Sequence, residues 1–241
     1  LPVRVVRSGA GTLAAGERMC RSFDSCGPVK IAHALGDAEA EVLLLPTILE
    51  VDDGEGAGGH TCVNEQAAPE LVGRALAALG RRIRVASPVL SFGERSWAGI
   101  ATRGSRVAAA LIAAGVPAST VAAGAWCAAW RAEEAQRGYE AALEGIGRRT
   151  LDYARARGLP VVVVCGSLHV VHDEAINARI PALVRRNGAL AVPADCFPTA
   201  AAPARARVPW GDARRARRAA VAARQAGTAV PVRRSAVGCG P

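Results

Sequence analysis

The chain of 241 residues is poor in aromatic side chains, which make up 4% of it. It also lacks apolar runs of membrane-spanning length, and the runs Val42–Pro46 and Val161–Cys165 have the length of single strands. A membrane-spanning helix needs about 20 apolar residues, so the sequence predicts no membrane span. Residues 1–10 interleave valine with arginine, unlike a secretory signal, and we therefore expect a cytoplasmic protein.

Cysteine is scarce for a disulfide-bonded protein, because seven residues are spread over the whole chain and no two are spaced as C-x-x-C. Disulfide scaffolds need a denser and paired set. The low, odd number favours reduced thiols, which fits the cytoplasm. An initiator methionine is also lacking and the sequence stops at Cys239–Pro241, so we expect a piece of a longer protein.

Lysine is almost absent, since Lys30 is the only one among 30 basic residues, and the formal net charge is +9. Arginines gather between Arg205 and Arg234, where Asp212 is the one acidic residue. Nucleic-acid binding would call for interleaved aromatic side chains, and only Trp210 is near. We therefore expect no nucleic-acid partner. The arginines suit a solvated helix face, or docking to an acidic partner or an anionic cofactor.

Short β-rich runs alternate with helical stretches rich in Ala, Arg and Glu. The predicted strands are Val3–Arg7, Glu41–Leu45, Ile83–Ala86, Pro160–Cys165, Ala189–Val192 and Ala229–Arg233. The predicted helices are Glu65–Leu79, Ala101–Ala114, Ser119–Arg157, Asp173–Arg186 and Asp212–Gln225, with Ser119 and Asp173 as N-caps. Strands separated by helices of this length are typical of parallel sheets in α/β proteins.

The fold class predicted is α/β, with two lobes of parallel sheet. Residues 99–158 carry almost no strand signal, so we interpret 96–158 as a helical insert between an N-terminal lobe at 1–95 and a C-terminal lobe at 159–241. We expect the N-terminal lobe to be incomplete at its start and the C-terminal lobe to be incomplete at its end.

A glycine-rich segment, Asp52–Gly59, matches the dinucleotide-binding pattern G-x-G-x-x-G. The pattern should lead directly from a strand into a helix, whereas the next predicted helix begins only at Glu65. The acidic residues Asp52, Asp53 and Glu55 would also repel a phosphate. We interpret the segment as a loop.

Cys165 follows the predicted strand Pro160–Cys165, with His169 and His172 close behind. Ligand sites of open α/β sheets lie at the carboxyl ends of strands, so this thiol could act as a nucleophile beside an imidazole. A buried structural cysteine is the other interpretation. The thiol-dependent hydrolase or transferase that would use Cys165 and His169 remains an alternative function.

Three other cysteines, Cys26, Cys62 and Cys239, lie in loop-like segments, two of them beside glycine and proline. Such loops can turn backbone N–H groups toward sulfur. Iron–sulfur clusters use this arrangement, because thiolates bind the iron and N–H groups tune the cluster.

Together with their surroundings, these segments resemble those of the acyl-CoA dehydratase activase-related family, whose relatives are the 2-hydroxyacyl-CoA dehydratase and benzoyl-CoA reductase subunits. The resemblance runs in order through several segments from about residue 20 onward: Ser25–His33, Leu43–Leu49, His60–Gln66, Ser87–Phe92, Gly166–Leu183, Val192–Asp195, Trp210 with the helix after it, and Ser235–Pro241.

The resemblance implies a fold of two Rossmann-like lobes with a 4Fe–4S cluster in the cleft. It implies that Cys26, Cys62 and Cys239 are the cluster ligands; Cys196 would be a possible fourth. It also implies ATP-driven transfer of one electron to a CoA thioester, as in 2-hydroxyacyl-CoA dehydratases (lyases), with an activator ATPase as partner, often on the same polypeptide.

Two departures from the family pattern, Ser167–His169 and Val63, fall at the expected cleft and bear on substrate choice and activity. The function predicted is an iron–sulfur protein of this class. A non-catalytic lobe that docks to an activator ATPase is a further alternative.

Overall fold

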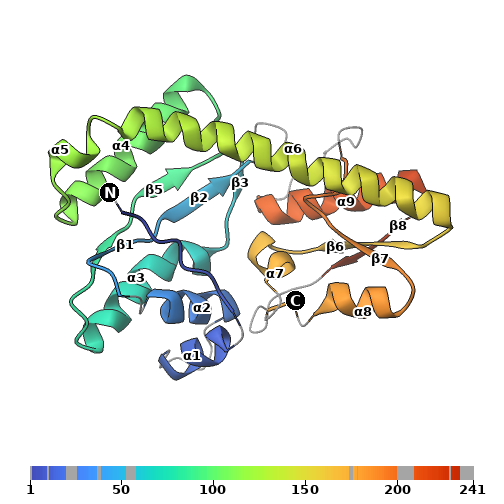
Figure 1. Cartoon of the computed structure of the whole chain (residues 1–241), viewed down its shortest axis with the longest axis horizontal. Helices are drawn as coiled ribbons and strands as arrows, with labels where there is room; N and C mark the ends of the chain where they lie inside the picture. Colours follow the sequence, from blue (N-terminus) through green and yellow to red (C-terminus); the bar gives the residue numbers. More distant parts are fainter. Residues whose placement is uncertain are drawn as a thin grey trace.

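The computed structural model describes residues 2–9, 11–19, 26–36, 39–52, 58–173, 176–177, 179–199, 209–227 and 229–233. It is a mixed α/β fold whose two halves lie side by side under one long helix (Figure 1). Small, mostly parallel sheets lie between helices, which confirms the predicted class at this level. The limits of the three predicted domains stay a prediction.

The N-terminal half is built on one parallel ladder that two prolines interrupt. Strands β1 (Val42–Leu44) and β4 (Arg84–Ala86) pair in parallel, and the chain continues from them into the parallel pair β2 (Thr47–Val51) and β5 (Val89–Ser91). Pro46 and Pro88 lie at the two junctions, where proline supplies no N–H for the ladder. The short strand β3 (Gly59–His60) adds to β2 in the antiparallel sense.

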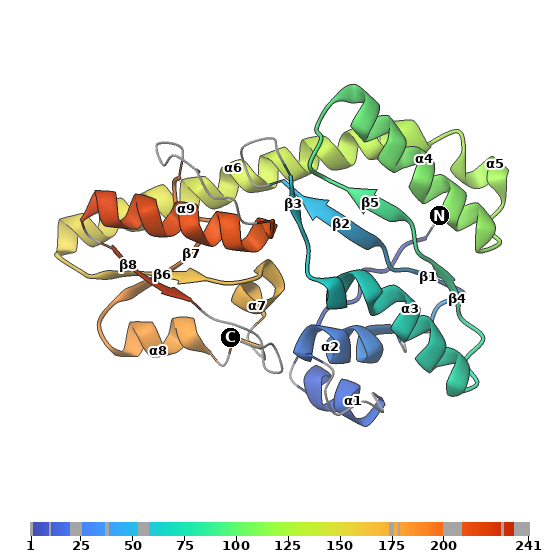
Figure 2. The same ribbon diagram turned by 180° about the vertical axis from the view of Figure 1, so that it is seen from behind.

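Helices cover both faces of this ladder (Figures 1 and 2). On one side lie α3 (Val63–Ala78), α2 (Gly27–Gly36) and, packed on α2, α1 (Thr12–Met19). On the other side lies α4 (Trp97–Ala113), whose N-terminus is capped by Ser96 Oγ accepting from Gly99 N at 3.1 Å. The short helix α5 (Ala118–Val121) leads from α4 to α6.

Helix α6 (Ala125–Arg157) connects the two halves. Its 33 residues give it a length of about 50 Å, so it packs on α4 at one end and on β7 at the other. Figure 2 shows it extending over both halves, above the two sheets. One continuous helix therefore contacts both halves.

The C-terminal half has a three-stranded parallel sheet in the order β7 (Leu190–Pro193), β6 (Val161–Cys165), β8 (Ala229–Arg233). Val161, Val163 and Cys165 of β6 face α6 and α9 (Gly211–Ala226), and this face forms the largest core cluster. Helix α8 (Ile180–Arg186) packs on β7, and α7 (Leu168–His172) follows β6 at the carboxyl edge of the sheet.

Most of the predicted elements are confirmed within a few residues, and three are wrong. Residues 2–9, predicted to contain a strand, have no regular secondary structure, with Val3 and Val5 exposed. The single helix predicted over Ser119–Arg157 is two helices, with Pro117 rather than Ser119 as the first N-cap. The helix predicted from Asp173 begins only at Ile180, because Pro181 is accepted in a first turn but not inside a helix.

Candidate functional site

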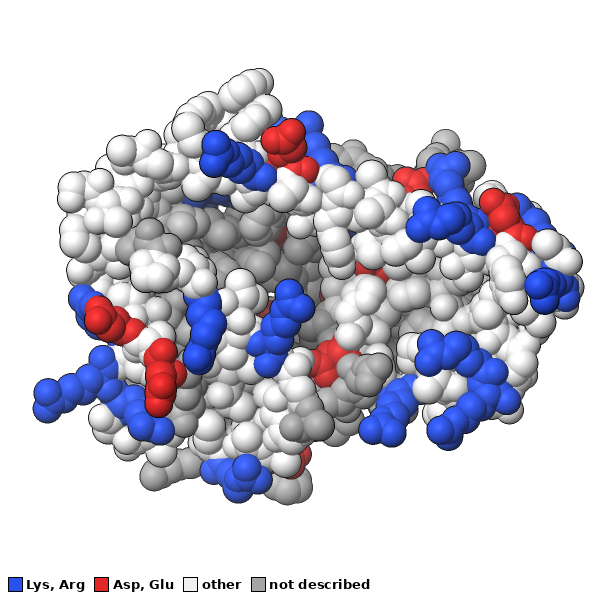
Figure 3. All heavy atoms as spheres, in the orientation of Figure 1, with Lys and Arg blue, Asp and Glu red and all other residues white. Residues whose placement is uncertain are grey.

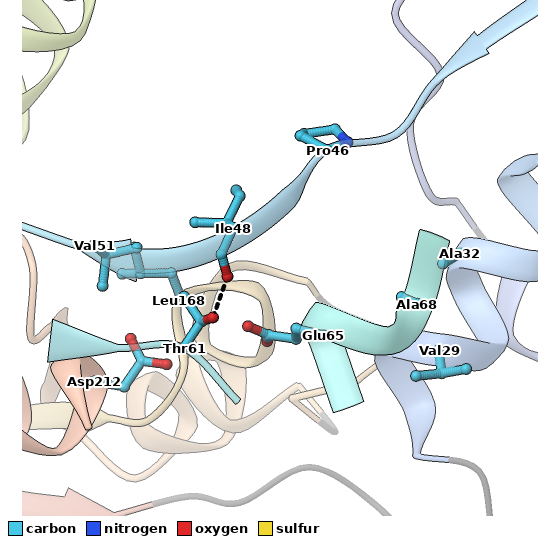
Figure 4. A pocket seen from close by; sticks show the side chains of 10 residues that line it. All are labelled: Val29, Ala32, Pro46, Ile48, Val51, Thr61, Glu65, Ala68, Leu168 and Asp212. Carbon is cyan, nitrogen blue, oxygen red and sulfur yellow. Dashed lines mark hydrogen bonds between the residues drawn. The ribbon is translucent and has the colours of Figure 1, made fainter. Parts of the chain in front are cut away.

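A pocket of about 290 Å³ lies between the two halves (Figure 4). Its walls are mostly apolar and come from α2, β2 and α3 on the N-terminal side. The C-terminal side contributes Leu168 of α7 and Asp212 of α9. The carboxylates of Glu65 and Asp212 are among the few polar groups of the lining, and Asp212 pairs with Arg215 at 3.2 Å.

The turn between β3 and α3 is fixed by side-chain hydrogen bonds around Thr61. The hydroxyl of Thr61 donates to Ile48 O, and its backbone N–H donates to Leu49 O at 3.0 Å. Gln66 Nε2 returns from α3 and donates to Thr61 O at 3.2 Å. The residue that follows Thr61 is therefore held in a defined place beside the pocket.

That residue is Cys62, the N-cap of α3. Its backbone is extended, with φ −61° and ψ 136°, and its carbonyl accepts the first helical hydrogen bond from Gln66 N at 3.1 Å. Its side chain makes no capping hydrogen bond and is half-buried. The thiol thus stands at the positive end of a helix of 16 residues.

Cys26 has the same relation to α2, which begins at the next residue. The carbonyl of Cys26 accepts from Lys30 N at 3.1 Å, and the side chain is buried against Val29 and Ala68. Val29 and Ala68 also line the pocket, and so does Thr61, the residue before Cys62. Helix α2 was not predicted, and the placement of Cys26 at its N-terminus could not be foreseen.

Two thiols at the starts of two packed helices form a suitable setting for anionic sulfur. The free N–H groups of a helix start can give hydrogen bonds to metal-bound sulfur. Thiolates are the ligands that iron–sulfur clusters prefer. By residue type and by their places at helix starts, Cys26 and Cys62 therefore fit a role as ligands of such a cluster.

The third predicted ligand, Cys239, lies outside the described residues. Within the described ranges, no three His, Cys, Asp or Glu side chains come together as metal ligands. Lys30 and His33, from the same segment as Cys26, do not line the pocket. Lys30 Nζ lies 3.5 Å from Glu17 Oε1, and the buried ring of His33 donates from Nδ1 to Val29 O at 2.7 Å.

Other cysteines have different surroundings. Cys165 and Cys196 are buried in the C-terminal core, and burial raises the pKa of each thiol to about 11. A thiol with that pKa stays protonated near neutral pH, which argues against Cys165 as a nucleophile. Cys196 belongs to the C-terminal core, whereas Cys26 and Cys62 stand at helix starts in the N-terminal half, so its role as a fourth ligand stays a prediction. Cys127 is exposed on α6, and Cys20 lies outside the described residues.

A close pair of polar side chains, His172 and Asp195, was missed in the sequence. His172 Nε2 lies 2.8 Å from Asp195 Oδ2, at the carboxyl edge of β6 and β7. The hydrogen bond to Asp195 raises the pKa of His172, with burial opposing it and the charge of Asp195 adding to it. Each residue comes shortly after a predicted strand, and this position could have marked both as site candidates. Nothing in the sequence indicated that the two side chains would meet.

The glycine-rich segment ends in a packing contact. A Cβ on Gly59 would lie 2.3 Å from Gly211 Cα, so β3 and the start of α9 approach closely here. The Nη1 of Arg214 donates to Gly58 O at 2.9 Å. Gly59 thus has a structural role. Gly54 and Gly56 lie outside the described residues.

The comparison with known families decides the identity of the chain. The model of the family described as CoA enzyme activase uncharacterised domain matches residues 3–197. The chain belongs to this family. The match includes Cys26, Cys62 and most of the pocket lining, and it agrees with the resemblance to acyl-CoA dehydratase activase-related proteins.

No curated protein and no solved structure matches this activase domain. Among its described helices, none is both long and apolar enough to cross a membrane.

Proposed function

We propose that this activase domain holds a 4Fe–4S cluster at the pocket between its halves, with Cys26, Cys62 and Cys239 as ligands. The position of the first two thiols supports the proposal most directly, because each precedes one of two packed helices and neighbours of both, Val29 and Thr61, line the same pocket. Three thiolates leave one iron open to water, a substrate or a further residue. In this proposal the two halves are Rossmann-like lobes and the pocket is their cleft.

The proposed role is ATP-driven one-electron transfer to a CoA thioester substrate or to a partner that carries it. When bound, the cluster would supply the electron-transfer chemistry. The chain itself holds the sulfur atoms at two helix starts, fixes one of them through Thr61 and Gln66, and lines the site with apolar side chains that limit water.

The proposed partner is an activator ATPase, on the same polypeptide or on another. The surface suits an anionic partner, because basic side chains are scattered widely over the face shown in Figure 3. A net charge of +9 attracts the phosphates of CoA or an acidic protein surface.

The test is the iron and acid-labile sulfide content of protein purified without oxygen, together with its visible absorption. We expect a cluster in the unaltered chain. Cys26→Ala or Cys62→Ala should lower the iron content several-fold, because each removes a ligand.

Cys127→Ala is the matched control, since Cys127 is an exposed thiol on α6, away from the pocket. It should keep the full cluster. An unaltered chain without iron and sulfide would overturn the proposal, and so would a loss of iron in the control equal to that in Cys62→Ala.

A further inference from the structure

Three of the four tryptophans of the chain lie together on the outer face of the N-terminal half, where α4 and the first turns of α6 run side by side (Figures 1 and 2). The indole ring of Trp97 stacks on that of Trp130, with ring centroids 4.1 Å apart, and on that of Trp126 at 5.7 Å. Trp97 is 61% exposed and Trp126 is 45% exposed. A single exposed apolar side chain is ordinary, but a stacked group marks an interaction surface, and tryptophan is enriched at the centres of protein interfaces.

A row of four exposed residues on α6 lies beside these tryptophans. It is formed by Cys127, Arg131, Glu134 and Gly138, whose spacing of four, three and four residues places them along one face of the helix. None of the four lines the pocket between the halves. We call this set the α6 row, and it is open to a partner along about 16 Å of helix.

The α6 row is complementary to itself when two copies of the helix run antiparallel. In a symmetric dimer, a residue that faces a second residue across the twofold axis is matched by the reverse contact. A register that sets Arg131 against Glu134 of the second copy therefore makes two ion pairs. The same register sets Cys127 against Gly138, because both pairs share one midpoint on the helix, and the glycine leaves room for the thiol. The axis also keeps the α4 sides together, so the tryptophans of both copies lie along the same edge of the contact.

Charge favours a second copy over another kind of partner. Within the part of the chain that the structure describes, Arg131 and Glu134 take part in no ion pair or hydrogen bond, so both are available to a partner. A second copy pairs both of them, whereas an acidic protein would pair with Arg131 and be repelled by Glu134. The net charge of +9 makes two copies repel each other where arginines dominate, so a face with one charge of each sign suits their contact.

We propose that two copies of this chain form a symmetric dimer through the α6 row, with Trp97, Trp126 and Trp130 of both copies covered beside it. The exposed indoles supply roughly 150–250 Å² on each copy, about a quarter of the roughly 800 Å² that each side of a stable interface buries. The α6 row and the neighbouring turns of α4 add to this area. The dimer needs no iron and uses no residue of the pocket, so it stands or falls separately from the proposed cluster.

The first test is sedimentation equilibrium of the full chain, with and without iron, over a range of micromolar concentrations. We expect the mass to rise from one copy to two, and the tryptophan emission to shift to shorter wavelength with it, because indole rings leave water. Trp97→Ala should weaken the dimer at least about tenfold. Tyr153→Ala is the matched control, since Tyr153 is a half-exposed aromatic residue at the far end of α6. A chain that stays a single copy at every concentration overturns the proposal, and so does equal association of the two variants.

The second test exchanges the charges of the α6 row. Arg131→Glu and Glu134→Arg each set like charges against one another, so each variant alone should dimerise at least about tenfold more weakly than the unaltered chain. An equal mixture of the two variants restores opposite charges at both contacts and should form a heterodimer about as stable as the unaltered dimer. A mixture that associates no better than its components overturns the proposal. An acidic activator ATPase that binds the single copy and is released by Arg131→Glu would assign the row to another protein and would overturn it as well.

Discussion

His172 shows how a single pair of residues can make stability depend on pH. Its pKa is raised from the ordinary value of 6.5, first by the hydrogen bond to Asp195 and then by the charge of Asp195, against the effect of burial. The pKa of the neighbouring Tyr139 is raised by burial and by the charges of Asp195 and Cys196. Its hydroxyl therefore stays neutral and adds no charge beside His172. The protonated histidine is thus the form that the folded state favours.

We predict that the free energy of unfolding falls as the pH rises past this group. A pKa raised in the folded state gives stability that is full below about pH 6.5 and is lost as the pH passes the folded value. Urea unfolding of the unaltered chain across this range should show the fall. His172→Gln and Asp195→Asn should each flatten it.

Asp152→Asn, at an exposed carboxylate on α6, serves as control and should keep the full dependence. If the free energy of unfolding of His172→Gln falls with pH as steeply as that of the unaltered chain, the His172–Asp195 pair does not cause the pH dependence.

At the scale of single elements, α6 offers two glycines that differ only in their surroundings. A Cβ on Gly147 would lie 1.7 Å from the carbonyl oxygen of Cys196, so any side chain there pushes the helix from the C-terminal sheet. A Cβ on Gly138 would meet nothing within 4 Å. The close contact at Gly147 is what lets α6 pack on the segment after β7.

We predict opposite effects of the same substitution at these sites. Gly147→Ala should lower the free energy of unfolding by about 1–3 kcal/mol, because a backbone must move. Gly138→Ala should raise it by up to about 1 kcal/mol, since alanine favours the helix. Urea unfolding monitored by circular dichroism measures both. Equal effects would mean that α6 does not depend on the contact with Cys196.

The same elements show which parts of the fold the sequence can predict. Strands β6 and β8 were predicted within a residue, and β6 was easily found because an uninterrupted apolar run marks a strand buried on both faces. Strands β2 and β5 were missed, since Pro46 and Pro88 precede them and suggest loops. The predicted strand Val3–Arg7 alternates apolar and basic residues as a strand does, but pairing depends on a partner strand that a local pattern cannot reveal.

The candidate site was predictable only in part for a similar reason. Cys26 and Cys62 could be identified from their neighbours in sequence, but their places at the starts of two packed helices depend on the packing of α2 on α3. A larger cavity, of about 750 Å³, has walls from β2, β5, α4, α5, α6, α7 and α9, and most of its lining residues are apolar, with alanine the most frequent. Such residues carry no local signal, so only the assembled structure reveals the space between them.

For the whole molecule, the charged cluster around Arg95 connects segments that are far apart in the chain. Arg95 follows β5 and binds Asp52 after β2 as well as Glu140 on α6. Arg215 of α9 adds a hydrogen bond from Nη2 to Asp52 O at 3.1 Å. The cluster therefore joins the N-terminal half, the connecting helix and the C-terminal half beside both cavities.

We predict that Arg95→Met loosens this junction and lowers the free energy of unfolding by about 1–3 kcal/mol, because carboxylates in a half-buried setting lose their partner. Arg148→Met is the control, since Arg148 and Glu144 form an exposed pair on α6, worth about 0.5 kcal/mol or less. Urea unfolding measures both, and hydrogen exchange of α9 should rise in Arg95→Met alone. A cost no larger than that of the control would mean that packing, and not this cluster, holds the two halves together.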